Sequence, residues 1–128
     1  MSSLSFDRAA STISLSDKNG AKVGSWDAAN NVDSLSSPWP AGKYDFDYAK
    51  THADDAPDSP YGSYGIVIFV VAGRTALGVH SGRVNTADGL GRKGYKHATN
   101  GCVRTTDDGM SKILSVHSKD ALTTITLS

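Results

Sequence analysis

The longest apolar run of the chain, residues 66–72, constrains its fold more than any other feature. The run is continuous and rich in β-branched residues, and Gly73 ends it, so it predicts a central strand covered on both faces. The hydrophobic fraction of the whole chain is a modest 38%, and Gly and Ser are abundant. For a chain of 128 residues we therefore expect a single domain, residues 1–128, built mostly of strands and loops.

Other segments of the chain carry strand and turn signals around this central strand. Strands are predicted at residues 12–16, 22–26, 43–48, 75–79 and 122–127, several of which alternate polar and apolar residues. The pair Asn19-Gly20 joins the first two as a predicted hairpin. Residues 51–65 and 81–101 are predicted to be long loops, which in compact domains are usually functional or mobile.

The sequence predicts one helix, which begins just after Cys102. Thr106 is the expected N-cap, and Asp107 and Asp108 lie in the first turn, where the helix dipole favours negative charge. One face of this helix, at the i, i+3, i+4 and i+7 positions, carries Met110, Ile113, Leu114 and His117. We expect His117 to be structural because it lies on this apolar face. The chain is therefore predicted to be mainly β.

The charges of the chain limit its classes of partner. Lys plus Arg and Asp plus Glu balance at 13 each, which argues against a nucleic-acid partner. No apolar run approaches the ~20 residues of a membrane span, and residues 1–8 lack the apolar segment of a signal peptide. The cations gather late in the chain, at Arg74, Arg83, Arg92, Lys93, Lys96 and Arg104. They form either a solvated basic surface or a cluster that attracts carboxylates and lowers the pKa of a nearby thiol.

Cys102 is the only cysteine, so it can form no internal disulfide, and one thiol is too few for a structural zinc site. Asn100 and Gly101 precede it and Arg104 follows, so no apolar run carries it into a core. His80 lies upstream, at the expected C-terminal end of a strand. This pattern indicates a thiol nucleophile with a histidine base, and the alternative is an inert, buried cysteine.

The order of these elements and motifs matches that of a known family. A strand ending in His80-Ser81 is followed by a glycine-rich loop, the block Thr99-Asn100-Gly101-Cys102-Val103-Arg104, a helix and a last strand. In this arrangement, over roughly residues 10–127, the chain resembles the catalytic domain of the L,D-transpeptidase (YkuD-type) family. Asn100 stands where the family has a second His, and 18 residues separate His80 from Thr99, slightly more than is usual in the family.

The resemblance implies a two-sheet β-sandwich with one helix after the cysteine, and an enzyme that needs no metal or other cofactor. Cys102 would attack the carbonyl of the third residue of a peptidoglycan stem tetrapeptide and expel the terminal D-Ala. His80 would take the thiol proton and return it to the leaving amine, with its second ring nitrogen held by a backbone carbonyl near Ser81. Backbone N–H groups near Gly101 and Cys102 would hold the oxyanion.

Residues around these motifs are candidates for binding the substrate. They are Tyr61, Tyr64, Arg83, His97, Thr99, Asn100 and Arg104. Arg104 either orients a substrate carboxylate or pins its loop by bonding backbone carbonyls. Each tyrosine covers the cleft, donates to the oxyanion or only packs. Arg83 and His97 either face the substrate or lie exposed in their loops. His52 is expected to be structural.

The resemblance leaves the fate of the acyl-enzyme open, because an acceptor amine gives a cross-link whereas water gives L,D-carboxypeptidase trimming. It implies action in the periplasm or cell wall. Since no export signal is seen, the chain is either an antibacterial effector delivered by a specialised secretion machine, with an immunity protein as partner, or a trimmed sequence. The competing classes are a catalytically inactive wall-binding module of the same fold and a papain-like peptidase, in which the Cys precedes the His.

Overall fold

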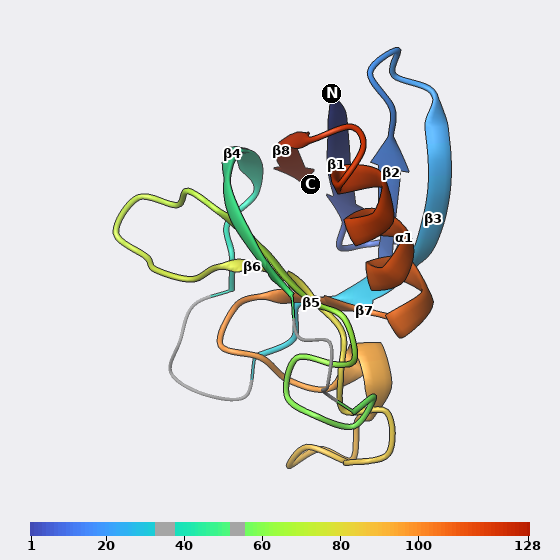
Figure 1. Cartoon of the computed structure of the whole chain (residues 1–128). Helices are drawn as coiled ribbons and strands as arrows, with labels where there is room; N and C mark the ends of the chain where they lie inside the picture. The colour runs from blue at the N-terminus through green and yellow to red at the C-terminus, as the bar shows by residue number, and fades with distance from the viewer. Residues whose placement is uncertain (33–37, 52–55) are drawn as a thin grey trace.

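The computed structural model describes residues 1–32, 38–51 and 56–128, and Figure 1 shows their elements along the chain. The expectation for His52 falls outside the described residues. The strands are β1 (Ser2–Asp7), β2 (Thr12–Ser16), β3 (Lys22–Ala29), β4 (Gly42–Thr51), β5 (Gly65–Phe69), β6 (Gly78–His80), β7 (Val103–Thr105) and β8 (Leu122–Leu127). A 3-10 turn, η1 (Gly94–Lys96), precedes β7, and the helix α1 (Asp107–His117) precedes β8.

The described strands form one closed barrel in the order β1-β2-β3-β7-β6-β5-β4-β8, so the expected two-sheet sandwich is wrong. The reason lies in the two longest strands, each of which crosses from one half of the barrel to the other. β3 pairs with β2 over most of its length and with β7 only at Ala28 and Ala29. β4 pairs with β8 over residues 42–45 and, past an irregularity at residues 46–48, with β5. The mainly β class with one helix is confirmed.

The apolar run becomes β5, and all five residues of this strand are buried, as expected for a strand covered on both faces. The strand is shorter than the run, since it ends at Phe69, and Val70 is 56% exposed. The strand expected at residues 75–79 is shifted, since only residues 78–80 form β6. A Cβ at Gly78 would overlap the Val67 carbonyl oxygen, so a glycine allows β6 to approach β5 this closely.

Strand β1 is not predicted by the sequence analysis, yet it closes the barrel by pairing antiparallel with β2 and parallel with β8. Leu4 and Phe6 are buried opposite Leu15 and Ile13, so β1 presents its apolar face to the core. The alternation of Ser3, Leu4, Ser5 and Phe6 is a strand signal in the sequence that could have predicted β1. The two chain ends lie at opposite ends of the parallel β1–β8 pair, because Ser2 lies opposite Leu122 and Phe6 lies opposite Leu127.

Helix α1 begins where the sequence predicts. The Thr106 hydroxyl oxygen accepts a hydrogen bond from the Gly109 N–H, which is the expected N-cap. Met110 and Ile113 are fully buried in the same hydrophobic core as the strands. His117 is structural, as expected: its ring lies 4.8 Å from that of Phe46, and its Nδ1 accepts the Leu122 N–H. No helix in the described part of the chain has the length and apolar character needed to cross a membrane.

The site is positioned by two short strands that lie side by side. β6 and β7 pair in parallel, with Val79 opposite Val103 and His80 opposite Arg104. The residue just before β7 is Cys102, so this register places the cysteine beside Gly78, two residues before His80 on β6. Strand β7 is not predicted from the sequence, because three residues are too few for a periodicity to be visible.

Candidate active site

His80 ends β6 and is only 2% exposed. Its Nδ1 lies 2.8 Å from the carbonyl oxygen of Ser81. Because a carbonyl can only accept, Nδ1 carries the ring proton and Nε2 is left as an acceptor. Burial lowers the pKa of His80 to about 4, and the positive charge of Arg104 acts in the same direction. The hydrogen bond with Ser81 opposes this shift but does not outweigh it. The imidazole is therefore neutral at pH 7.

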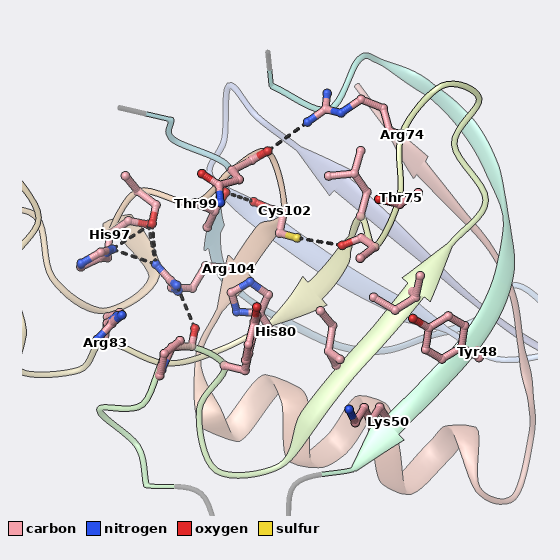
Figure 2. Close-up of a pocket in the computed structure, with 18 residues that line it drawn as sticks. Tyr48, Lys50, Arg74, Thr75, His80, Arg83, His97, Thr99, Cys102 and Arg104 are labelled. Carbon is pink, nitrogen blue, oxygen red and sulfur yellow. Dashed lines mark hydrogen bonds between the residues drawn. The ribbon is translucent and has the colours of Figure 1, made fainter. Parts of the chain in front are cut away.

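Cys102 points its sulfur into the same cavity that His80 lines, as Figure 2 shows. The Sγ–H donates to the Ala76 carbonyl oxygen at 3.5 Å. Burial raises the pKa of the Cys102 thiol, although a backbone hydrogen bond from Gly78 and the charges of Arg104 and Arg74 oppose the rise. Of the two alternatives for the cations, the one in which they lower this pKa does not hold in net direction, because burial outweighs them. The resting pair is a neutral thiol and a neutral imidazole.

The turn that carries the cysteine is held by Thr99. Its hydroxyl donates to the Cys102 carbonyl at 2.8 Å and accepts the Gly101 N–H at 3.0 Å. Gly101 has φ 123°, a conformation that favours glycine. Thr99 thus shapes the turn, and the Gly101 N–H, which we expect to serve the oxyanion, is occupied in this conformation.

Arg104 is 4% exposed and donates to backbone carbonyls in two loops, the one before β5 and the one between β6 and β7. The acceptors and donor–acceptor distances are Ser81 (Nε, 3.2 Å), His97 (Nη1, 2.8 Å), Ala98 (Nη1, 2.9 Å) and Pro60 (Nη2, 3.0 Å). Burial lowers the pKa of Arg104 to about 10, so the guanidinium stays charged at pH 7. These contacts favour the loop-pinning alternative over a role in binding a substrate carboxylate.

The cavity has a volume of about 560 Å³ and brings together most of the expected substrate residues. From the expected set it is lined by Tyr61, Arg83, His97, Thr99, Asn100 and Arg104. Tyr61 lies edge-on to the His80 ring, with ring centroids 5.0 Å apart. Tyr64 is 44% exposed and lies outside this lining, so the expectation that it faces the cleft does not match the structure.

Charge in the cavity has one sign. Among the described lining residues are Lys50, Arg74, Arg83 and Arg104, and none of the lining residues is acidic. The other predicted cations, Arg92, Lys93 and Lys96, do not line it; Arg92 pairs with Asp88 at 2.7 Å. A cavity of this charge attracts carboxylates.

One wall of the cavity is missed by the sequence analysis. Strands β4 and β5 and the segment before β6 supply it, with Tyr48, Lys50, Ile66, Ile68 and Leu77. Tyr48 and Lys50 stand two residues apart on β4 and so share a face. That spacing is visible in the sequence, but the pairing that turns this face toward Cys102 is not.

Ser81 joins the site through two different groups. Its carbonyl accepts from both His80 Nδ1 and Arg104 Nε, and its hydroxyl donates to Asp107 at 2.5 Å. From the sequence, Asp107 is expected only to complement the helix dipole. Its contact with Ser81 could not be predicted, because 25 residues separate the two in the sequence.

Comparisons with known proteins support the fold. No protein-family description matches the sequence, and no curated protein has significant sequence similarity to it. Solved structures that match it include L,D-transpeptidase 1 of Mycobacterium tuberculosis (14% identity, TM-score 0.58) and the L,D-transpeptidase of Xylanimonas cellulosilytica (14%, 0.61). The L,D-transpeptidase of Mycobacterium smegmatis matches at 15% identity and a TM-score of 0.57.

Each match covers 99% of this chain but only 58% to 60% of the matching structure. The chain therefore spans about three fifths of the length of these proteins. At these identities the likeness establishes the fold, and the expected resemblance to L,D-transpeptidases is confirmed at that level.

Proposed function

We propose that the protein is a cysteine acyl-transfer enzyme of the L,D-transpeptidase type that acts on peptidoglycan stem tetrapeptides. The observation that carries this proposal is that Cys102 and His80 line one cationic cavity, with His80 Nδ1 held by the Ser81 carbonyl. The fold shared with solved L,D-transpeptidases supports it.

The neutral resting pair determines how the proton moves. As the Cys102 sulfur attacks the carbonyl carbon of the third stem residue, the thiol proton passes to His80 Nε2. The C–N bond to the terminal D-Ala then breaks, and the leaving amine takes that proton from the imidazolium. A thioester on Cys102 remains. The low pKa of His80 makes its imidazolium a strong acid, so the return of the proton to the amine is favourable.

The oxyanion of the tetrahedral intermediate needs backbone donors near the nucleophile. The Cys102 N–H is adjacent to the reacting sulfur. The Gly101 N–H joins it when its bond to the Thr99 hydroxyl opens. One such donor is typically worth ~3 kcal/mol in the transition state.

The cations of the cavity suit the carboxylates of a stem peptide. Arg83 lies on the His97 side of the cavity, while Lys50 and Arg74 lie on the other side of Cys102 (Figure 2). Arg104 acts instead by fixing the loops around His80. This distribution supports Arg83, Arg74 and Lys50 as the residues that contact charged groups of the substrate.

The acyl-enzyme has two outcomes, transfer to an acceptor amine or hydrolysis to a tripeptide. Both belong to the periplasm or cell wall, where peptidoglycan lies. In the effector role, the protein directed to the periplasm of a sensitive cell would be toxic, and an immunity protein would suppress the toxicity. In the competing role, an inactive wall-binding module would bind peptidoglycan without changing it.

Mass spectrometry of tetrapeptide muropeptides incubated with the protein tests the proposal. We expect loss of D-Ala, or a new dimer or exchanged residue, with the wild type and not with Cys102→Ala. Asp108→Asn is a matched control, because Asp108 is exposed and lies outside the lining of the cavity. Unchanged muropeptides with binding retained would instead support the wall-binding module.

A further inference from the structure

The first residue of α1 ties together two loops that meet at the candidate base. Asp107 Oδ1 accepts from the Ser81 hydroxyl at 2.5 Å and from the Ser63 N–H at 3.2 Å. Asp107 Oδ2 accepts from the Ser63 hydroxyl at 2.8 Å. One carboxylate therefore receives three hydrogen bonds, and hydrogen bonds to an ionised group are the stronger kind.

Each tied residue is next to a group that touches His80. The Ser81 carbonyl accepts the proton of His80 Nδ1. Ser63 lies two residues after Tyr61, whose ring packs edge-on against the His80 ring. Asp107 thus connects, through Ser81 and Ser63, to two groups that contact the imidazole.

The two loops pack closely against each other. A Cβ at Gly62 would overlap the Ser81 hydroxyl oxygen and lie 2.8 Å from Asp107 Oδ1. A Cβ at Gly82 would overlap the Ser59 carbonyl oxygen. Arg104 fixes the same two loops from the other side, through the Ser81 and Pro60 carbonyls.

We propose that Asp107 is a positioning residue for His80, which holds the Ser81 carbonyl and the 59–63 loop so that the ring keeps its proton on Nδ1 and presents Nε2 to Cys102. This inference rests on the proposed function only in assigning His80 as the base. The contacts themselves do not depend on which substrate is bound.

A simpler role for Asp107 is to complement the helix dipole, and Asp108 separates the two roles. Asp108 lies in the same first turn with the same charge, but it is exposed. If Asp107 acted only on the helix dipole, Asp107→Asn and Asp108→Asn would have similar effects on the His80 tautomer and on turnover. A positioning effect appears only in Asp107→Asn.

The first readout is the tautomer of His80, measured in the full chain by ¹⁵N NMR of the histidine ring nitrogens. We expect the Nδ1–H form in the wild type and in Asp108→Asn, and a mixture with the Nε2–H form in Asp107→Asn. The same tautomer in all three proteins would overturn the proposal. This readout needs no substrate, so it remains decisive even if tetrapeptides prove not to be the substrate.

The second readout is turnover of tetrapeptide. We expect kcat to fall about tenfold or more in Asp107→Asn with KM nearly unchanged, as for a misplaced catalytic group. Ser81→Ala removes the same hydroxyl contact but keeps the carbonyl, so the double variant should lose no more than the more damaged single variant. Multiplicative losses would contradict action through Ser81. Should Asp107→Asn fail to fold, Ser63→Ala and Ser81→Ala carry both readouts.

Discussion

Replacing His80 with glutamine should remove a defined pH dependence of stability. In the folded protein burial lowers the pKa of His80 to about 4, against 6.5 for an unperturbed histidine. Between these values the unfolded chain binds a proton that the folded protein does not, so stability falls as the pH drops from about 6.5 to 4. At ~1.4 kcal/mol for each tenfold difference in proton affinity, the loss reaches about 3 kcal/mol.

The assay is urea denaturation of the wild type and His80→Gln at pH 7, 6, 5 and 4, followed by tryptophan fluorescence. Carboxylates that titrate in the same range are common to both proteins and cancel in the difference. The wild type should lose about 3 kcal/mol relative to His80→Gln between pH 7 and pH 4. A difference below about 1 kcal/mol, or one of opposite sign, would refute the neutral buried imidazole and favour a charged thiolate–imidazolium pair.

Three further substitutions test other parts of the account. Arg104→Lys keeps the charge but cannot reach four carbonyls, so urea denaturation should show a loss of about 3 kcal/mol. Gly62→Ala should cost about 2 kcal/mol more than Gly91→Ala, because both glycines have φ 79° but only the Cβ at position 62 meets other atoms. Lys50→Ala should raise KM for tetrapeptide about threefold in steady-state assays, whereas Lys43→Ala, on the same strand but outside the cavity, should not.

The sequence predicts those parts of the fold that local pattern determines. The apolar run gives β5, and the Thr106 cap with its apolar face gives α1. The barrel is not predictable in the same way, because its closure depends on how far β3 and β4 extend past one partner to reach another. Strand propensity says where a strand forms but does not select its partner.

The candidate site was likewise predictable where local motifs determine it and not where tertiary contacts do. The motifs place Cys102 and His80 at one cavity, and the register of β6 and β7 explains how. The sequence could not show that Thr99 occupies the Gly101 N–H, or that Asp107 reaches Ser81. It also could not show that burial outweighs the cations at the thiol, because the sign of that pKa shift depends on how deeply the sulfur lies.

The most direct test of the central claim is to trap the acyl-enzyme. The wild type is mixed with a tetrapeptide, quenched in acid, and measured as intact protein by mass spectrometry, followed by peptide mapping. We expect an adduct equal to the stem peptide without its terminal D-Ala, located on Cys102 and absent from Cys102→Ala. No adduct on a folded protein whose thiol still reacts with iodoacetamide, together with unchanged tetrapeptide, would contradict the account.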